Sequence, residues 1–209
     1  RISFMKYLDY PEQQKHGSLD FPYYFYRVTP IHPRYTMPYH WHPLFEIVHV
    51  FQGQFHLQLD NCLLELNAGD TALIQGGLGG APSPNEDCIY ECILIDLETV
   101  FSHSTRQYEQ ALTDLLNSKI LVRNFFPASF TDINQLIDQM LDLLRSKPKS
   151  SALSHYGCTY LLFGALFSQN YYRKNTVSKE SRRFSSLKPV FSLIEERYNE
   201  NLSLTTLAR

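Results

Sequence analysis

The sequence lacks a long apolar run, an apolar leader and a paired-cysteine motif, and each absence excludes a class of protein. Its apolar runs end well short of the roughly 18 residues that a membrane-spanning helix needs. Residues 1–18 do not contain the apolar core of a secretory signal. The cysteines Cys62, Cys88, Cys92 and Cys158 form no CxxC pair, which indicates reduced thiols rather than a disulfide framework. These features predict a cytoplasmic protein with no membrane partner.

The sequence also has little excess charge of either sign. Its 19 lysines and arginines are balanced by 21 acidic residues, and the net charge is -2. No basic excess therefore indicates nucleic-acid binding by this chain alone. A hydrophobic share of 44% over 209 residues excludes a disordered chain and is enough for one large domain, or one domain with a small appendage.

The first half of the chain carries short apolar runs that are separated by turn residues. The runs that predict strands are Phe21–Val28, Phe45–Gly53, Gln54–Asp60, Cys62–Leu66, Thr71–Gln75 and Cys88–Asp96. Many short strands at this spacing are typical of an antiparallel sandwich or barrel.

The second half has the apolar spacing of helices. Thr131–Lys147 and Ser151–Arg173 predict two helices that form an antiparallel hairpin, packed on the barrel or on a partner chain. We take one apolar stripe as a candidate homodimer face, with packing on the chain's own barrel as the alternative. The stripe consists of Ile133, Leu136, Ile137, Met140, Leu141 and Leu144. The polar, basic segment 174–188 is interpreted as a solvated linker, with a phosphate-contacting arm as the alternative.

The most informative motif is HWHPLFEIVHVFQG. Because His40, His42 and Glu46 share parity, an extended strand would direct all three side chains the same way. Two imidazoles and a carboxylate are a ligand set for a divalent metal. His49 has the wrong parity to join them, and His56 lies on the face opposite a run of apolar residues.

This motif resembles the first motif of the cupin barrel, with HxH, a glutamate and then Gly53 at the family's spacing. The segment from Gly69 resembles the second motif, which in the family supplies a histidine as fourth metal ligand. Here Gln75, Gly77 and Gly80 take the family's proline, glycine and histidine positions, so that ligand is missing. We therefore interpret the triad as a hydrogen-bonded polar cluster with no metal cofactor. A divalent metal on His40, His42 and Glu46, physiological or acquired during purification, is the alternative.

The last stretch, PVFSLIEERYNENLSLTTLAR, predicts an amphipathic helix, a short turn and a second helix capped by Ser203. It resembles the start of the DNA-binding domain of AraC/XylS-family transcription regulators, which ends here before any recognition helix. The resemblance implies a mainly β protein with C-terminal α structure. It predicts an N-terminal arm and cupin-like antiparallel jelly roll at 1–125, a helical dimerisation segment at 126–173, the linker at 174–188 and a truncated helix-turn-helix start at 189–209.

The resemblance implies a small effector in the barrel, such as a sugar or another metabolite, and a homodimer whose DNA contacts come from a missing C-terminal region. Candidate effector-binding residues are Tyr24, Tyr26, Arg27, Arg34, Tyr39, His40, Trp41, His42, Glu46, Gln75 and Tyr90. Binding would shift the population of arrangements of the N-terminal arm or the helices. Two alternatives stay open. One is a metal-dependent cupin enzyme, a dioxygenase or sugar isomerase that uses the triad, and the other is a sugar-binding cupin without a DNA role.

Overall fold

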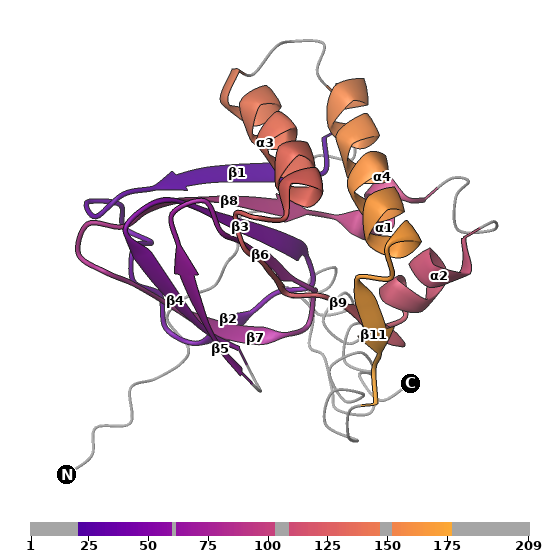
Figure 1. The fold of residues 1–209 in the computed structure, drawn as a ribbon, viewed down its shortest axis with the longest axis horizontal. Helices are drawn as coiled ribbons and strands as arrows, with labels where there is room; N and C mark the ends of the chain where they lie inside the picture. The colour runs from indigo at the N-terminus through magenta and orange to yellow at the C-terminus, as the bar shows by residue number, and fades with distance from the viewer. Residues whose placement is uncertain (1–20, 60–61, 103–108, 147–151, 177–209) are drawn as a thin grey trace, which may run out of the picture.

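Two antiparallel sheets and a pair of helices form three layers in the computed structural model, which describes residues 21–59, 62–102, 109–146 and 152–176 (Figure 1). The strands are β1 (Tyr23–Val28), β2 (His40–Trp41), β3 (Phe45–Gln52), β4 (Gln54–Leu59), β5 (Cys62–Asn67), β6 (Thr71–Ile74), β7 (Gly79–Pro84), β8 (Ile89–Ile95), β9 (Ile120–Val122), β10 (Phe125–Phe126) and β11 (Tyr172–Lys174). The helices are α1 (Leu97–Val100), α2 (Gln110–Leu116), α3 (Thr131–Ser146) and α4 (Ala152–Ser168).

One sheet has the strand order β1-β8-β3-β6-β10, and the sheet facing it has the order β2-β7-β4-β5. All strand pairs are antiparallel, and β9 pairs with β11 in a separate two-stranded sheet. The predicted mainly β jelly roll with C-terminal helices is confirmed. The predicted helix-turn-helix start at 189–209 lies outside the described residues.

Side-chain alternation explains why the four-stranded sheet has one buried face. In β4, Phe55, Leu57 and Leu59 are buried, whereas Gln54 and Gln58 are exposed. The single residue between β3 and β4 is Gly53, which adopts a φ of 75°. A Cβ there would also lie 3.0 Å from the Cα of Cys88, so this turn requires glycine.

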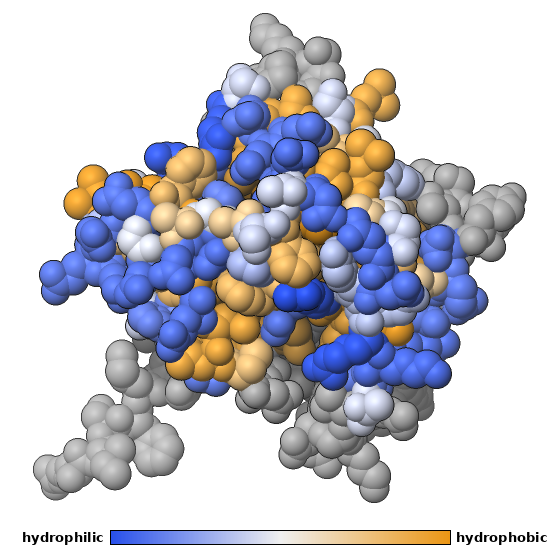
Figure 2. Space-filling view, in the orientation of Figure 1, coloured by the Kyte–Doolittle hydropathy of each residue, from blue (hydrophilic) through white to orange (hydrophobic). Residues whose placement is uncertain are grey.

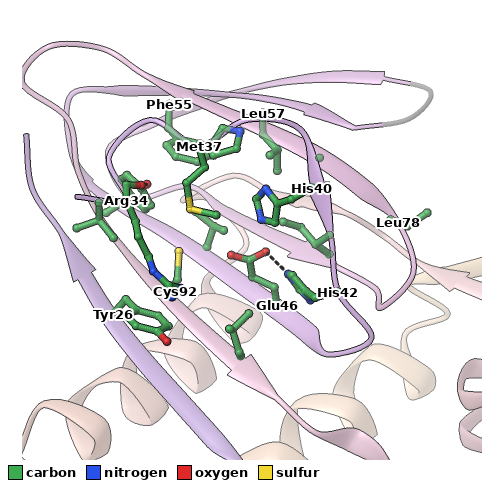
Figure 3. Close-up of a pocket in the computed structure, with 17 residues that line it drawn as sticks. Tyr26, Arg34, Met37, His40, His42, Glu46, Phe55, Leu57, Leu78 and Cys92 are labelled. Atoms are coloured by element: carbon green, nitrogen blue, oxygen red, sulfur yellow. Dashed lines mark hydrogen bonds and ion pairs between the residues drawn. The ribbon is translucent and has the colours of Figure 1, made fainter. Parts of the chain in front are cut away.

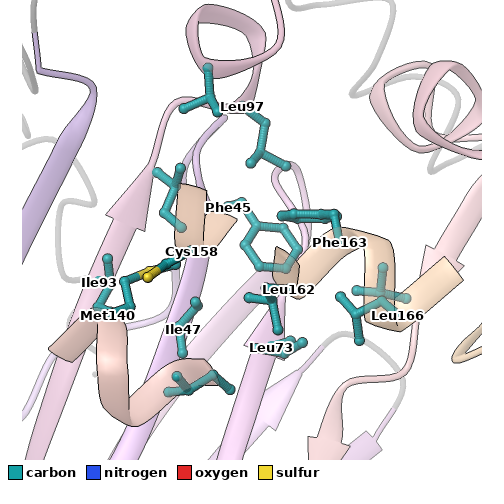
Figure 4. Packing of buried hydrophobic residues seen from close by; sticks show 14 of the residues in the cluster. Phe45, Ile47, Leu73, Ile93, Leu97, Met140, Cys158, Leu162, Phe163 and Leu166 are labelled. Atoms are coloured by element: carbon teal, nitrogen blue, oxygen red, sulfur yellow. The ribbon is translucent and has the colours of Figure 1, made fainter. Parts of the chain in front are cut away.

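The helices α3 and α4 pack side by side over the outer face of the five-stranded sheet (Figure 1). Figure 4 shows Phe45 and Ile47 of the sheet against Met140 of α3 and Phe163 of α4. Within the described part of the chain, no helix is long and apolar enough to cross a bilayer. The region between the barrel and these helices, expected to be mostly helical, also contains the short strands β9 and β10.

The apolar stripe on α3 is buried inside the chain, which corrects its assignment as a dimer face. Ile133, Ile137, Met140 and Leu141 are 0% exposed and Leu144 is 5% exposed, all within the core between sheet and helices. Leu136 is half-buried. The alternative, packing on the chain's own barrel, describes these side chains correctly.

A buried carboxylate links this helix to the sheet. Glu91 of β8 is 0% exposed and accepts hydrogen bonds from Arg145 of α3, with its Nη2 at 2.7 Å, and from Nη1 of Arg27 in β1, also at 2.7 Å. Both guanidinium groups also pack on the ring of Phe51, with the Cζ of Arg145 4.7 Å and the Cζ of Arg27 5.0 Å from its centroid. Charge-assisted bonds of this kind offset the cost of burying the carboxylate.

We expect Arg145→Met to lower the free energy of unfolding by about 3 kcal/mol, because the variant leaves a buried charge with only part of its compensation. Arg27 keeps its bond to Glu91, so the loss lies at the lower end of the range for broken buried ion pairs. Urea unfolding at neutral pH measures the change. Arg173→Met, on the exposed arginine of β11, is the matched control and should change stability by less than about 0.5 kcal/mol. Equal effects of the two substitutions would contradict this account.

Candidate functional site

A cavity lies between the two sheets, and Tyr26, His40 and Glu46 are among the polar side chains that surround it (Figure 3). Its empty volume, including solvent space at the mouth, is about 680 Å³. It is lined by Tyr26, Val28, Arg34, Met37, His40, His42, Glu46, Val48, Phe55, Leu57, Ile74, Leu78, Gly80, Pro82, Tyr90, Cys92 and Leu94. Both sheets contribute to this lining, and none of these residues belongs to α3 or α4.

The motif residues His40, His42 and Glu46 all line the cavity, but they do not lie on one extended strand. His40 belongs to β2 in the four-stranded sheet, and Glu46 belongs to β3 in the five-stranded sheet. The chain bends at Pro43 and Leu44 as it passes between the sheets. The predicted convergence is thus present, and its predicted cause, the shared parity on a single strand, is wrong.

The hydrogen bonds of His42 define its protonation state. Its Nε2 lies 3.1 Å from Oε2 of Glu46, and its Nδ1 lies 3.0 Å from the backbone oxygen of Leu44. A carbonyl oxygen and an ionised carboxylate only accept hydrogen bonds, so both ring nitrogens must donate. His42 is therefore an imidazolium, and with Glu46 it forms an ion pair whose side chains are only 11% and 16% exposed.

Glu46 is held in its ionised form by its neighbours. Burial acts to raise the pKa of this carboxyl group, but the hydrogen bond and charge of His42, the charge of His40 and a hydrogen bond from Cys92 together lower the pKa below its ordinary value. Burial of the thiol raises the pKa of Cys92 well above its usual value. The charge of Glu46 and the hydrogen bond to it raise this pKa further. Cys92 is therefore a protonated donor rather than a nucleophile.

This arrangement does not fit a metal centre. Both nitrogens of His42 are used as donors, so a metal ion would have to displace a proton from this ring and break one of its two hydrogen bonds. His40 presents one remaining nitrogen, because its Nδ1 lies 3.0 Å from the carbonyl oxygen of Pro38. Among the residues whose positions are described, no group of three or more histidine, cysteine or acidic side chains is placed to hold a metal ion.

Aromatic and basic residues complete the polar lining of the cavity. The guanidinium of Arg34 lies over the ring of Tyr26, with 4.8 Å between its Cζ and the ring centroid. The hydroxyl of Tyr90 donates to the backbone oxygen of Arg34 at 3.3 Å, and its ring lies 4.5 Å from that of Phe55. Three of the predicted residues, Tyr26, Arg34 and Tyr90, are therefore brought together beside the ion pair.

Two predicted residues lie elsewhere. Arg27 points to the helix side of the five-stranded sheet, because it neighbours Tyr26 in β1 and successive side chains alternate. Gln75 is buried next to α2, where its amide donates to the backbone oxygens of Leu115 and Ile120, each at 3.1 Å. The structure thus corrects the placement of Arg27 and Gln75 in the cavity.

The remaining candidates are outside the cavity lining or outside the description. Tyr24 shares the strand face of Tyr26 but lies beyond the lining residues. Tyr39 is 46% exposed and covers Gly79, where any side chain would collide with its ring. The side chain of Trp41 lies outside the described part of the structure.

Several lining residues are not among those that the sequence predicts. Cys92 could have been found, because it shares strand parity with Tyr90. The apolar residues Val48 and Leu57 carry the same alternation, which shows that they are buried but not that they border a cavity. Met37 lies in an irregular segment, where no periodicity indicates its direction.

The comparison with known families agrees with this architecture. A family model described as AraC-like ligand binding domain matches residues 22–155. No curated protein matches the sequence.

Similar solved structures include a cupin-2 domain protein from Shewanella frigidimarina, at 21% identity and a TM-score of 0.29, with coverage of 34% of this chain and 66% of that one. A protein of unknown function from Streptococcus pyogenes has 17% identity, a TM-score of 0.28 and coverage of 29% and 53%. An oxalate decarboxylase variant from Bacillus subtilis has 18% identity, a TM-score of 0.28 and coverage of 29% and 18%. The chain thus spans about half the length of the Streptococcus protein.

The lowered pKa of Glu46 predicts a pH-dependent contribution to stability. A carboxyl group whose folded pKa is depressed stabilises the fold above its unfolded pKa of about 4.3, and this contribution is lost as the pH falls through the folded value. The stability difference between the wild type and Glu46→Gln should therefore be full at pH 7 and shrink steadily below about pH 4. Urea unfolding at pH 7, 5, 4 and 3 measures it.

The matched control for this titration is Glu65→Gln, on the exposed face of β5. Its stability difference from the wild type should stay within about 0.5 kcal/mol at every pH. If the wild type and Glu46→Gln differ in free energy of unfolding by the same amount at pH 7 and at pH 3, the result would contradict the ion pair.

Proposed function

The chain belongs to the AraC-like ligand binding domain family, and we propose from this membership that it is the effector-binding and dimerisation part of a DNA-binding transcription regulator. The observation that carries the proposal is the cavity inside the matched domain. It offers a polar cluster and an apolar wall to a small metabolite, and one of its two sheets also supports the helices.

The site favours binding over catalysis. A general acid or base must exchange a proton with a substrate, and a nucleophile must be activated. Glu46 and His42 are committed to each other, and the raised pKa of Cys92 keeps its thiol protonated. The metal-dependent cupin enzyme has the triad as its only support, and a metal would have to displace a proton that His42 donates to Glu46 or to Leu44.

DNA is the second proposed partner, through a C-terminal region that begins at about residue 189. The support is the resemblance of residues 189–209 to the start of the family's helix-turn-helix domain. A cytoplasmic location goes with this role.

A homodimer is proposed through the outer face of α4, in place of the buried stripe on α3. Leu153 is 86% exposed and Leu161 is 59% exposed, and a Cβ built on Gly157 or Gly164 of the same helix meets no atom within 4 Å. Figure 2 shows hydrophobic surface over this helix, near the top of the view. Small residues between exposed leucines let a second helix approach closely, and its burial of the leucines would stabilise the pair.

Substitution inside the cavity tests the effector site. Val48→Phe should lower effector affinity at least roughly tenfold, because the larger ring occupies ligand space and a tenfold loss corresponds to about 1.4 kcal/mol. The complete gene product is tested in cells with a reporter whose transcription it controls. The reporter response to each member of a metabolite collection is measured. Ile47→Phe, at the neighbouring residue on the helix side of β3, is the control for overpacking. An unchanged response in Val48→Phe would contradict the proposal.

Substitution on α4 tests the dimer separately. Leu161→Asp should raise the dimer dissociation constant by roughly tenfold or more, because the symmetric interface loses two buried leucines and gains two charges. Sedimentation equilibrium of the 209-residue chain gives this constant. Leu63→Asp changes a leucine of β5 that is 54% exposed, and it should leave the constant unchanged. If both substitutions raise the dissociation constant by the same factor, or if neither raises it, this face of α4 is not the dimer interface.

A further inference from the structure

The cavity has more apolar wall than a sugar requires. Ten of the 17 lining residues are apolar or glycine, and they come from both sheets. Val48 and Leu94 face it from one sheet, and Phe55 and Leu57 face it from the other. A polyol in this space would place several hydroxyl groups against hydrocarbon, and each unpaired buried hydroxyl costs free energy.

The polar groups of the cavity are largely engaged with one another. His42 uses both nitrogens, and its charge neutralises Glu46. The hydroxyl of Tyr90 donates to a backbone oxygen, and the guanidinium of Arg34 packs over the ring of Tyr26. The cavity therefore presents fewer polar groups to a ligand rich in hydroxyls than its residue types alone suggest.

One acceptor stands out in the polar lining. Nδ1 of His40 donates to the carbonyl oxygen of Pro38, so Nε2 carries a lone pair whenever the ring is uncharged, which is the state that this inference requires. No residue in the described ranges forms a hydrogen bond with this nitrogen. Figure 3 shows the His40 ring among the side chains that surround the cavity, close to Met37 and His42. A ligand that donates one hydrogen bond there, and is otherwise apolar, matches the site.

Resting on the proposed effector function, we infer that the effector is a small, neutral, mainly apolar molecule with one hydroxyl donor, which binds through Nε2 of His40, and not a sugar. The ion pair beneath the ligand stays intact on binding, so the ligand needs no charge of its own. Burial of the apolar body supplies most of the affinity, and the single hydrogen bond supplies orientation.

A set of six-membered rings tests the inference on the 209-residue chain. The probes are cyclohexanol, cyclohexanone, myo-inositol and cyclohexanecarboxylate, and thermal unfolding across a concentration series gives each dissociation constant. Cyclohexanol should bind about three- to tenfold tighter than cyclohexanone, which cannot donate a hydrogen bond. Inositol and the carboxylate should bind more weakly than either.

Two matched variants locate the hydrogen bond. His40→Phe should remove the preference for cyclohexanol over cyclohexanone while both still bind. His56→Phe, on the outer face of β4, should keep it. The ratio of the two constants is read within one variant, so an overall loss of stability does not affect it.

Other outcomes overturn the inference. Tighter binding of inositol would favour a polyol effector and leave the proposed function standing. Tighter binding of the carboxylate would show recognition of an anion. No binding of any probe would also overturn the ligand class, whereas the proposed function fails only if the reporter response survives Val48→Phe. An unchanged preference for cyclohexanol in His40→Phe would overturn the role of Nε2.

Discussion

The five-stranded sheet is buried on both faces, and the rest of the structure depends on the register of its central strands. Along β3, Glu46 and Val48 face the cavity while Ile47 and His49 face the helices. A slip of one residue would exchange the two sets, because side chains alternate with a period of two. It would place an ionised carboxylate in the apolar helix core, so this register is strongly specified.

Each face of the sheet holds one acid with little or no exposure, and each acid has its own cationic partners. Glu46 is neutralised by His42 on the cavity side, and Glu91 is neutralised by Arg27 and Arg145 on the helix side. Such pairs add little net stability compared with apolar residues, but breaking one leaves an uncompensated charge. They therefore act mainly to exclude alternative registers, in which either acid would lack its partner.

Much of the fold followed from sequence periodicity, and most errors arose where periodicity carries no information about partners. The spacing of Ile137 and Met140 identified an apolar helix face, but it could not say whether the chain's own sheet or a second chain covers it. Tyr26 and Arg27 are both predicted to bind the effector, although neighbouring residues of one strand point to opposite faces. Strand parity alone was therefore enough to exclude one of them from the cavity. The convergence of His40 with Glu46 was found for the wrong reason, since it depends on a bend that the sequence marks only by Pro43.

The position of the cavity limits how a bound ligand can affect the helices. No described residue of α3 or α4 lines the cavity, so within the described structure any effect on these helices passes through the shared sheet. Strand β8 offers a direct connection, because Cys92 and Tyr90 face the ligand space while Glu91 between them is bound by Arg145 of α3. Suppose that β8 can take two positions relative to the helices. A ligand that binds both positions with equal affinity would leave the helices unchanged, however tightly it binds. Regulation therefore requires an effector whose contacts differ between two positions of β8.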